Sequence, residues 1–139
     1  MSTVFTRIIN GEIPGTFVHR DEVCVAFMSI NPIADGHLLV VPIREVDHWL
    51  DLDDDEAAHL FAISRRIARA LDAAFDCDRV GMIIAGYEVN HCHIHLIPTV
   101  SMADLDFRNA AQTVDRGHLE GLAARIRESI DSAGQNKPG

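Results

Sequence analysis

Residues 91–98 read HCHIHLIP and place three of the chain's eight histidines at alternate positions. Side chains alternate between the two faces of a β-strand, so His91, His93 and His95 are predicted to line one surface at intervals of roughly 6.5–7 Å. The intervening side chains are predicted to point into the core: Cys92, Ile94 and Leu96. We therefore expect a strand over residues 89–97, ended by Pro98, with one chemical face and one structural face.

Outward from this strand, the hydrophobic pattern predicts four more strands and two helices. Strands are expected over residues 16–20, 23–27, 37–41 and 80–84. Apolar residues recur at three- and four-residue steps over 53–75, behind an acidic run that suits a helix N-terminus. A second amphipathic stretch predicts a C-terminal helix at about 117–133. The expected fold class is α+β, with a five-stranded, mostly antiparallel sheet, one long helix and a C-terminal helix.

Length and composition predict a single domain over residues 1–139. The 139 residues are 47% hydrophobic and 24% charged, which is typical of one globular domain. A chain of this length buries enough surface to be stable without disulfides or a structural metal. Three widely spaced cysteines cannot all pair, and we expect reduced thiols that serve as small core residues: Cys24, Cys77 and Cys92.

The charge balance argues against two classes of partner. Twelve Lys and Arg against 21 Asp and Glu give a formal net charge of −9, which repels nucleic acid and anionic membrane surfaces. The first twenty residues contain no apolar run of signal-peptide length, and no uncharged stretch is long enough to span a bilayer. We expect a cytoplasmic protein that binds neither nucleic acid nor membrane.

Three imidazoles on one rigid face permit two chemistries. A zinc site needs about four ligands, and same-face positions on one strand supply only two of them comfortably. The others would have to come from histidines elsewhere in the chain: His37, His48 or His59. In the second chemistry, a neutral imidazole attacks an electrophile such as phosphorus while neighbouring imidazoles donate hydrogen bonds to the oxygens that gain charge. The residues favour the second chemistry and keep the metal site as the alternative.

The string HCHIHLI resembles the His-φ-His-φ-His-φ-φ signature, with φ apolar, of the histidine triad (HIT) nucleotide hydrolases and transferases. Two upstream segments extend the resemblance, FTRIINGEIP and INPIADGHLLVVP, in the order found in bacterial HIT proteins. The motif-bearing part covers about residues 4–100. The resemblance implies a HIT-like fold, a two-fold homodimer and no cofactor.

The resemblance also implies a role for each histidine of the motif. His93 matches the nucleophile that attacks the α-phosphorus of a nucleoside 5′-phosphate derivative, a phosphoramidate or a dinucleoside polyphosphate. The resulting nucleotidyl-histidine intermediate is resolved by water. His95 matches the residue that hydrogen-bonds the phosphate or leaving group, and His37 completes that pocket. His91 matches the residue that orients the nucleophile, in part through its main-chain carbonyl. The remaining histidines receive no role: His19, His48, His59 and His118.

A purine nucleotide is the partner that the resemblance implies. Five apolar residues are similar to those that sandwich the base: Phe5, Ile8, Ile13, Phe27 and Ile30. Aromatic and β-branched side chains suit a flat ring, because stacking tolerates several bases.

Three positions depart from the family pattern. Thr3-Val4-Phe5-Thr6 stands where many bacterial relatives carry a cysteine pair that belongs to a zinc site, so no structural metal is expected. Ser29 stands where Asp or Asn usually holds the ribose hydroxyls. In a shortened loop, Tyr87-Glu88 replaces Gln followed by Ser or Thr, and the Glu88 carboxylate repels a phosphate unless it is protonated or turned away. These differences affect which leaving group is expected more than which residue is the nucleophile.

Three functions are open from the sequence. The favoured one is a nucleotide hydrolase or transferase acting through His93. The second is a nucleotide-binding regulatory protein with little turnover, and the third is a His-rich metalloprotein.

Overall fold

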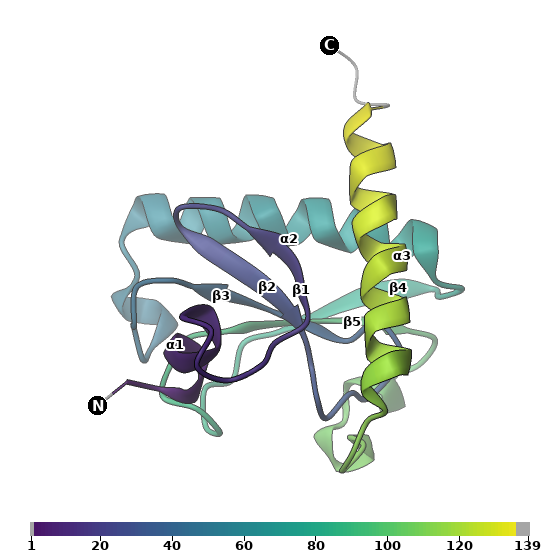
Figure 1. The fold of residues 1–139 in the computed structure, drawn as a ribbon, viewed down its shortest axis with the longest axis horizontal. Helices are drawn as coiled ribbons and strands as arrows, with labels where there is room; N and C mark the ends of the chain where they lie inside the picture. Colours follow the sequence, from purple (N-terminus) through teal and green to yellow (C-terminus); the bar gives the residue numbers. More distant parts are fainter. Residues whose placement is uncertain (1, 136–139) are drawn as a thin grey trace.

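A five-stranded sheet forms the centre of the computed structural model, which describes residues 2–135 (Figure 1). All four strand pairs are antiparallel, in the order β1-β2-β3-β5-β4. The strands span Phe17–Arg20 (β1), Cys24–Met28 (β2), Leu38–Pro42 (β3), Arg79–Ile83 (β4) and Ile94–Thr99 (β5). The expected α+β class is confirmed, and β1 to β4 lie within one residue of their predicted ranges. The range predicted for the domain extends past the described residues at both ends.

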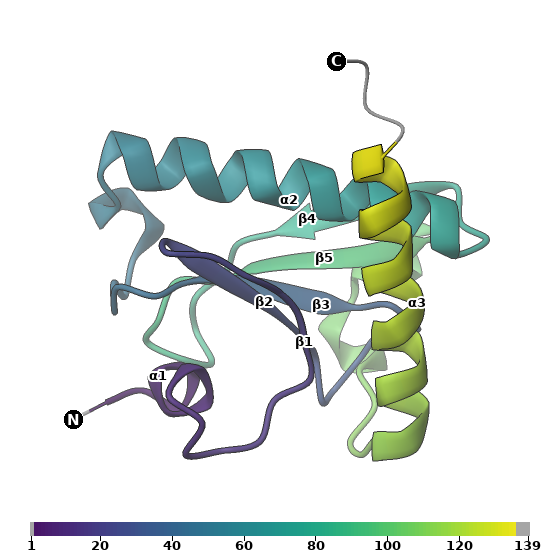
Figure 2. The ribbon, with the colours of Figure 1, turned by 45° about the horizontal axis from the view of Figure 1, so that its top comes forward.

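Two helices cover one face of the sheet, α2 over Asp54–Ala74 and α3 over Arg116–Gln135 (Figure 2). Asp53 caps α2 by accepting the Glu56 N–H, and the Glu56 carboxylate accepts the Asp53 N–H in return. This capping box explains part of the acidic run. Apolar residues of both helices pack against the sheet in one buried cluster that includes Leu60, Ile67, Leu71, Leu119, Ile126, Leu38 and Leu96. Over residues 2–135, no helix combines the length and the apolar character that crossing a bilayer requires.

A short helix, α1 over Val4–Ile9, was not predicted from the sequence. The hydroxyl of Thr3 caps it by accepting the Thr6 N–H, and Gly11 follows its end with a φ of 81°. Six residues are too few for a helical hydrophobic period to be recognised. α1 lies on the face of the sheet away from α2 (Figure 2), where Phe5 and Ile9 pack against β2 and β3.

The predicted strand over residues 89–97 is wrong at both ends. β5 begins at Ile94 and continues to Thr99, so His91 and His93 precede the strand. Pro98 does not end β5. Pairing with β3 stops at Leu96, so Pro98 pairs with β4 alone, and β5 continues along β4 to Thr99. Ile94 and Leu96 point into the core beneath α2 as predicted. Cys92 is buried ahead of the strand and lines a small cavity of about 240 Å³ instead.

Candidate functional site

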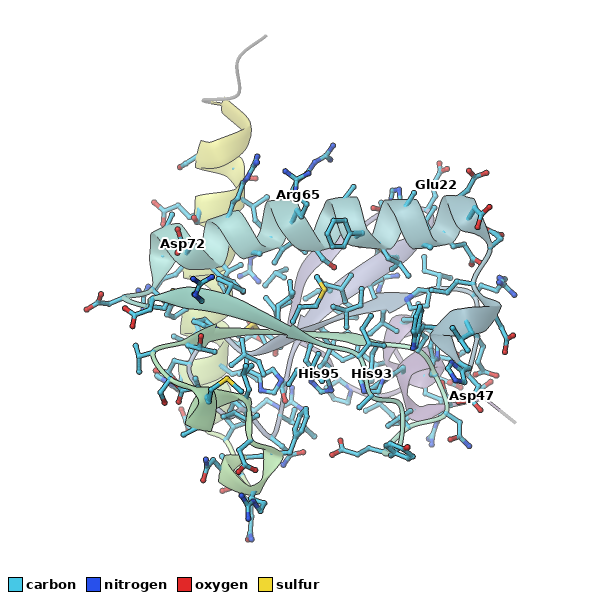
Figure 3. All side chains as sticks on the ribbon, turned by 180° about the vertical axis from the view of Figure 1, so that it is seen from behind. Glu22, Asp47, Arg65, Asp72, His93 and His95 are labelled. Atoms are coloured by element: carbon cyan, nitrogen blue, oxygen red, sulfur yellow. The ribbon has the colours of Figure 1, made fainter. Side chains whose placement is uncertain are left out.

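A cavity of about 530 Å³ opens on the face of the sheet away from α2. Figure 3 shows His93 and His95 on this side of the strands. Of the residues predicted for the site, all but His91 line the cavity: Phe5, Ile8, Ile13, Phe27, Ser29, Ile30, His37, Glu88, His93 and His95. The fold therefore gathers segments that are distant in sequence around one hollow of a size that suits a small ligand.

The site histidines are buried, and two of them precede β5, so they do not form an exposed strand face. The exposed fractions of His91, His93 and His95 are 0%, 3% and 6%, and that of His37 is 1%. The irregular segment ahead of β5 turns His91 inward behind the cavity, whereas His93 and His95 border it. The side predicted for the three imidazoles nevertheless holds: His93 and His95 line one cavity, and the centroid of the His91 ring lies 5.8 Å from that of the cavity residue Phe5.

The protonated nitrogen of His93 follows from its hydrogen-bond partner. His93 Nδ1 lies 2.7 Å from the main-chain carbonyl oxygen of His91. A carbonyl only accepts, so Nδ1 carries the hydrogen and donates it. Neutral His93 then has its lone pair on Nε2, for which no hydrogen-bond partner is found among residues 2–135. Nε2 is the nitrogen suited to nucleophilic attack.

A second chain of hydrogen bonds assigns the opposite tautomer to His95. The Ile33 N–H donates to His37 Nδ1 at 3.0 Å, so His37 carries its hydrogen on Nε2 when neutral. His37 Nε2 lies 2.9 Å from His95 Nδ1 and donates to it. Neutral His95 then carries its hydrogen on Nε2, where it is free to donate to a ligand.

Burial keeps His37 and His95 neutral near pH 7. Desolvation lowers the pKa of His37 to about 4. Desolvation, with the neighbouring His93 and His37, lowers the pKa of His95 to about 3. The His93 and His95 rings lie 4.9 Å apart between centroids. One offers a lone pair and the other an N–H at the same cavity, which is the pairing that attack on a phosphoryl group requires.

These shifted pKa values predict an acid-sensitive fold. The unfolded chain takes up protons on its imidazoles near pH 6.5, whereas folded His37 and His95 remain neutral until about pH 4 and 3. As the pH falls below 6.5, the free energy of unfolding should therefore fall by up to about 1.4 kcal/mol per pH unit for each imidazole. Urea unfolding between pH 7 and pH 4 measures this slope. A His37→Asn variant should show a shallower slope, and an unchanged slope would contradict the assignment.

The two polar residues predicted for nucleotide binding differ in their surroundings. Ser29 is buried, and its hydroxyl accepts the Asn31 N–H at 3.1 Å, which leaves the hydroxyl hydrogen available to a ligand. Glu88 is exposed at the cavity edge. A carboxylate in that position is solvated and imposes less repulsion on a bound phosphate than a buried one.

Sequence reasoning missed one wall of the cavity, formed by residues 107–116. The centroids of the Phe107 and His95 rings lie 4.8 Å apart in an edge-to-face arrangement. Arg116, at the start of α3, also lines the cavity. The side-chain amide of Asn31 holds this wall by donating to the carbonyls of Ala111 and Gln112. The segment has no regular period or motif, so no local signal in the sequence marks it as part of the site.

The potential metal ligands that cluster in the described part of the chain are not the site histidines. Across residues 2–135, one group of three such side chains has its ligand atoms within 4.8 Å of one another: His19, Asp21 and Cys24. Asp21 Oδ2 there accepts hydrogen bonds from the imidazoles of His19 and His59, at 2.7 and 2.8 Å. These contacts tie the turn between β1 and β2 to α2, away from the cavity.

Comparison with known proteins finds similarity along most of the chain. Residues 10–102 match the HIT domain. An uncharacterized HIT-like protein of Methanocaldococcus jannaschii is 38% identical over 99 residues, which cover 68% of this chain and 77% of the relative. An adenosine 5′-monophosphoramidase of Saccharomyces cerevisiae is 32% identical over 96 residues, covering 68% of this chain and 61% of the relative. The crystal structure of a Zn-bound histidine triad family protein from Mycobacterium smegmatis superposes with a TM-score of 0.84, at 26% identity over 99% of both chains.

Proposed function

Because this chain belongs to the HIT family, we propose that it is a nucleotide hydrolase or transferase that acts through a covalent intermediate on His93. The observation that carries this proposal is the pair of complementary tautomers at the cavity. His93 offers an unprotonated Nε2, and His95 offers an Nε2–H beside it. The phosphoramidase activity of the yeast relative favours a nucleoside phosphoramidate as one substrate class.

The proposed reaction has two displacements at the α-phosphorus. His93 Nε2 attacks phosphorus, the N–P bond forms, and the bond from phosphorus to the leaving nitrogen or oxygen breaks. His95 Nε2–H donates a hydrogen bond to the departing nitrogen or oxygen, which takes up its proton from solvent. Water then attacks the same phosphorus, the bond to His93 breaks, and the surplus proton of the water is released to solvent. Splitting the displacement into two steps lowers the barrier that direct attack of water would face.

The cavity supports a purine nucleotide as the group transferred. Phe5 and Phe27 pack edge to face with a centroid distance of 5.5 Å, and they border the cavity with the aliphatic side chains of Ile8 and Ile13. A flat base fits among such side chains without base-specific hydrogen bonds. We propose that Ser29 contacts the ribose and that Glu88 lies near the leaving group.

Intact-mass analysis after rapid quench tests the proposed intermediate. The protein is mixed with an adenosine 5′-phosphoramidate and quenched at alkaline pH in denaturant, since N–P bonds to histidine hydrolyse in acid. The expected result is a transient mass increase of one AMP that maps to His93. Product release without such an adduct, or an adduct on another residue, would overturn the proposal.

We also propose a homodimer that pairs across β4. β4 is an edge strand, and the exposed fractions of Met82 in β4 and Phe61 in α2 are 39% and 54%. An unpaired edge with exposed apolar side chains favours association with a second copy. Met82→Lys should convert a dimer to a monomer in sedimentation velocity runs. A wild-type protein that sediments as a monomer at micromolar concentration would contradict this prediction.

A further inference from the structure

A cluster of hydrogen bonds lies behind the cavity, formed by Thr3, Glu45 and His91. Glu45 Oε1 accepts the Thr3 N–H at 2.7 Å. The Thr3 hydroxyl lies 2.7 Å from His91 Nδ1, and His91 Nε2 lies 2.7 Å from the carbonyl oxygen of Pro42. Thr6, one helical turn further on, donates its hydroxyl to the same Glu45 oxygen at 2.8 Å without a hydrogen bond to His91.

The direction of each hydrogen bond in the cluster can be assigned. The Pro42 carbonyl accepts, so His91 Nε2 carries the hydrogen. Burial lowers the pKa of His91, which favours the neutral ring. Neutral His91 has its lone pair on Nδ1, so the Thr3 hydroxyl is the donor. Both ring nitrogens of His91 are thereby held, and its main-chain carbonyl is the acceptor that sets the tautomer of His93.

The same hydrogen bonds hold α1 in place beside the cavity. Thr3 is the residue that caps α1, and Phe5 in the first turn lies 4.9 Å from the His93 ring in an edge-to-face contact. Glu45 comes from the loop after β3, so its bond to Thr3 joins α1 to the sheet. Phe5 also lines the cavity, so a shift of α1 would move a wall of the site together with the ring of His93.

Zinc does not fit this cluster. Thr3 and Thr6 offer hydroxyls to this cluster, and threonine hydroxyls are not among the usual ligands of zinc. The two nitrogens of His91 are both occupied, one as a donor to Pro42 and one as an acceptor from Thr3. Hydrogen bonds therefore tie α1 to the segment before β5.

We propose that Thr3, anchored by Glu45, is a positioning residue for the nucleophile. Its hydroxyl holds the ring of His91, the His91 carbonyl then holds His93 Nδ1–H, and His93 Nε2 is left unprotonated and aimed at the cavity. Thr3 itself lies behind the cavity and touches no substrate. This inference rests on the proposed function for its kinetic consequence, but the tautomer of His93 is independent of any substrate.

Three variants test the kinetic consequence. Thr3→Val removes the hydroxyl at nearly constant shape and should lower kcat about tenfold or more, because a small misplacement of a nucleophile is costly, with KM and AMP affinity unchanged. Thr3→Ser keeps a hydroxyl and should restore kcat. Thr99→Val, the matched control, removes a hydroxyl that donates to the Arg79 carbonyl at the C-terminal end of β5 and should stay within about twofold of wild type. Equal losses in Thr3→Val and Thr99→Val would overturn the proposal.

A substrate-free measurement separates this inference from the proposed function. Long-range ¹H–¹⁵N spectra of the folded protein distinguish protonated from unprotonated imidazole nitrogens. The wild type should show His93 with a protonated Nδ1 and an unprotonated Nε2, and Thr3→Val should show averaging between the two tautomers. If Thr3→Val leaves the His93 signals unchanged, the positioning role is wrong even if the enzyme is active. If the signals change as expected and no adenosine derivative is cleaved, the proposed function fails and the positioning role stands.

Discussion

Replacing His93 with alanine is expected to abolish turnover of an adenosine 5′-phosphoramidate while AMP still binds. The substitution removes the one imidazole at the cavity whose Nε2 carries a lone pair, and with it the covalent route. A loss of at least about 10³-fold in kcat/KM is expected for removal of a nucleophile. Release of a fluorescent amine measures turnover, and titration calorimetry measures AMP binding.

The matched control for His93→Ala is His118→Ala, which removes an exposed imidazole on α3 that pairs with Asp35. This control should keep wild-type turnover. Turnover by His93→Ala at more than a tenth of the wild-type rate would contradict a nucleophilic His93. A wild-type protein that binds AMP and releases no amine from any phosphoramidate or dinucleotide would instead identify a nucleotide-binding protein with little turnover.

Replacing His95 with alanine is expected to lower kcat by about 10²–10³-fold with little change in AMP affinity, because a donor aimed at developing charge acts in the transition state. His37 holds His95 in the form that donates from Nε2, and burial keeps the pair uncharged. The loss should be smaller for an aryl ester of AMP, whose leaving group departs without a proton. Parallel kinetics on the amine and the aryl substrate check this difference.

An equal loss on both substrates would show that His95 serves the phosphate oxygens and not the leaving group. A loss below tenfold on both would contradict a direct contribution of His95. Asp35 and its hydrogen-bond partner His118 lie outside the cavity. Asp35→Asn is therefore a suitable control for effects of expression and purification that do not involve the site.

Much of the fold could be predicted from local patterns. The apolar period over 53–75, with acidic residues at its start, predicted α2 to within one residue at each end, because an amphipathic stripe and the charge preference of a helix N-terminus both depend on neighbouring positions. The strands β1 to β4 were found from β-branched runs between turn residues. α1 was missed because six residues carry too little periodicity, and its cap depends on Thr3.

Part of the candidate site was also predicted from the sequence, but from a motif and not from the local patterns that predicted the fold. The spacing of His91, His93 and His95 and the resemblance around it led to the cavity residues, although the strand begins only at Ile94 and all three imidazoles are buried. Phe107 and Arg116 were missed because an irregular segment brings them to the cavity from a part of the chain without a motif.

The order of residues along the chain specifies which side chains are available here: three closely spaced imidazoles, a distant His37, and apolar residues for a cavity wall. Which nitrogen of each imidazole carries its hydrogen depends on partners brought together only by folding, such as the His91 carbonyl for His93 and the Ile33 amide, through His37, for His95. A hydrogen-bond partner and the burial around it are properties of three-dimensional neighbours. For that reason the reactivity of these histidines follows from the folded chain and not from their spacing.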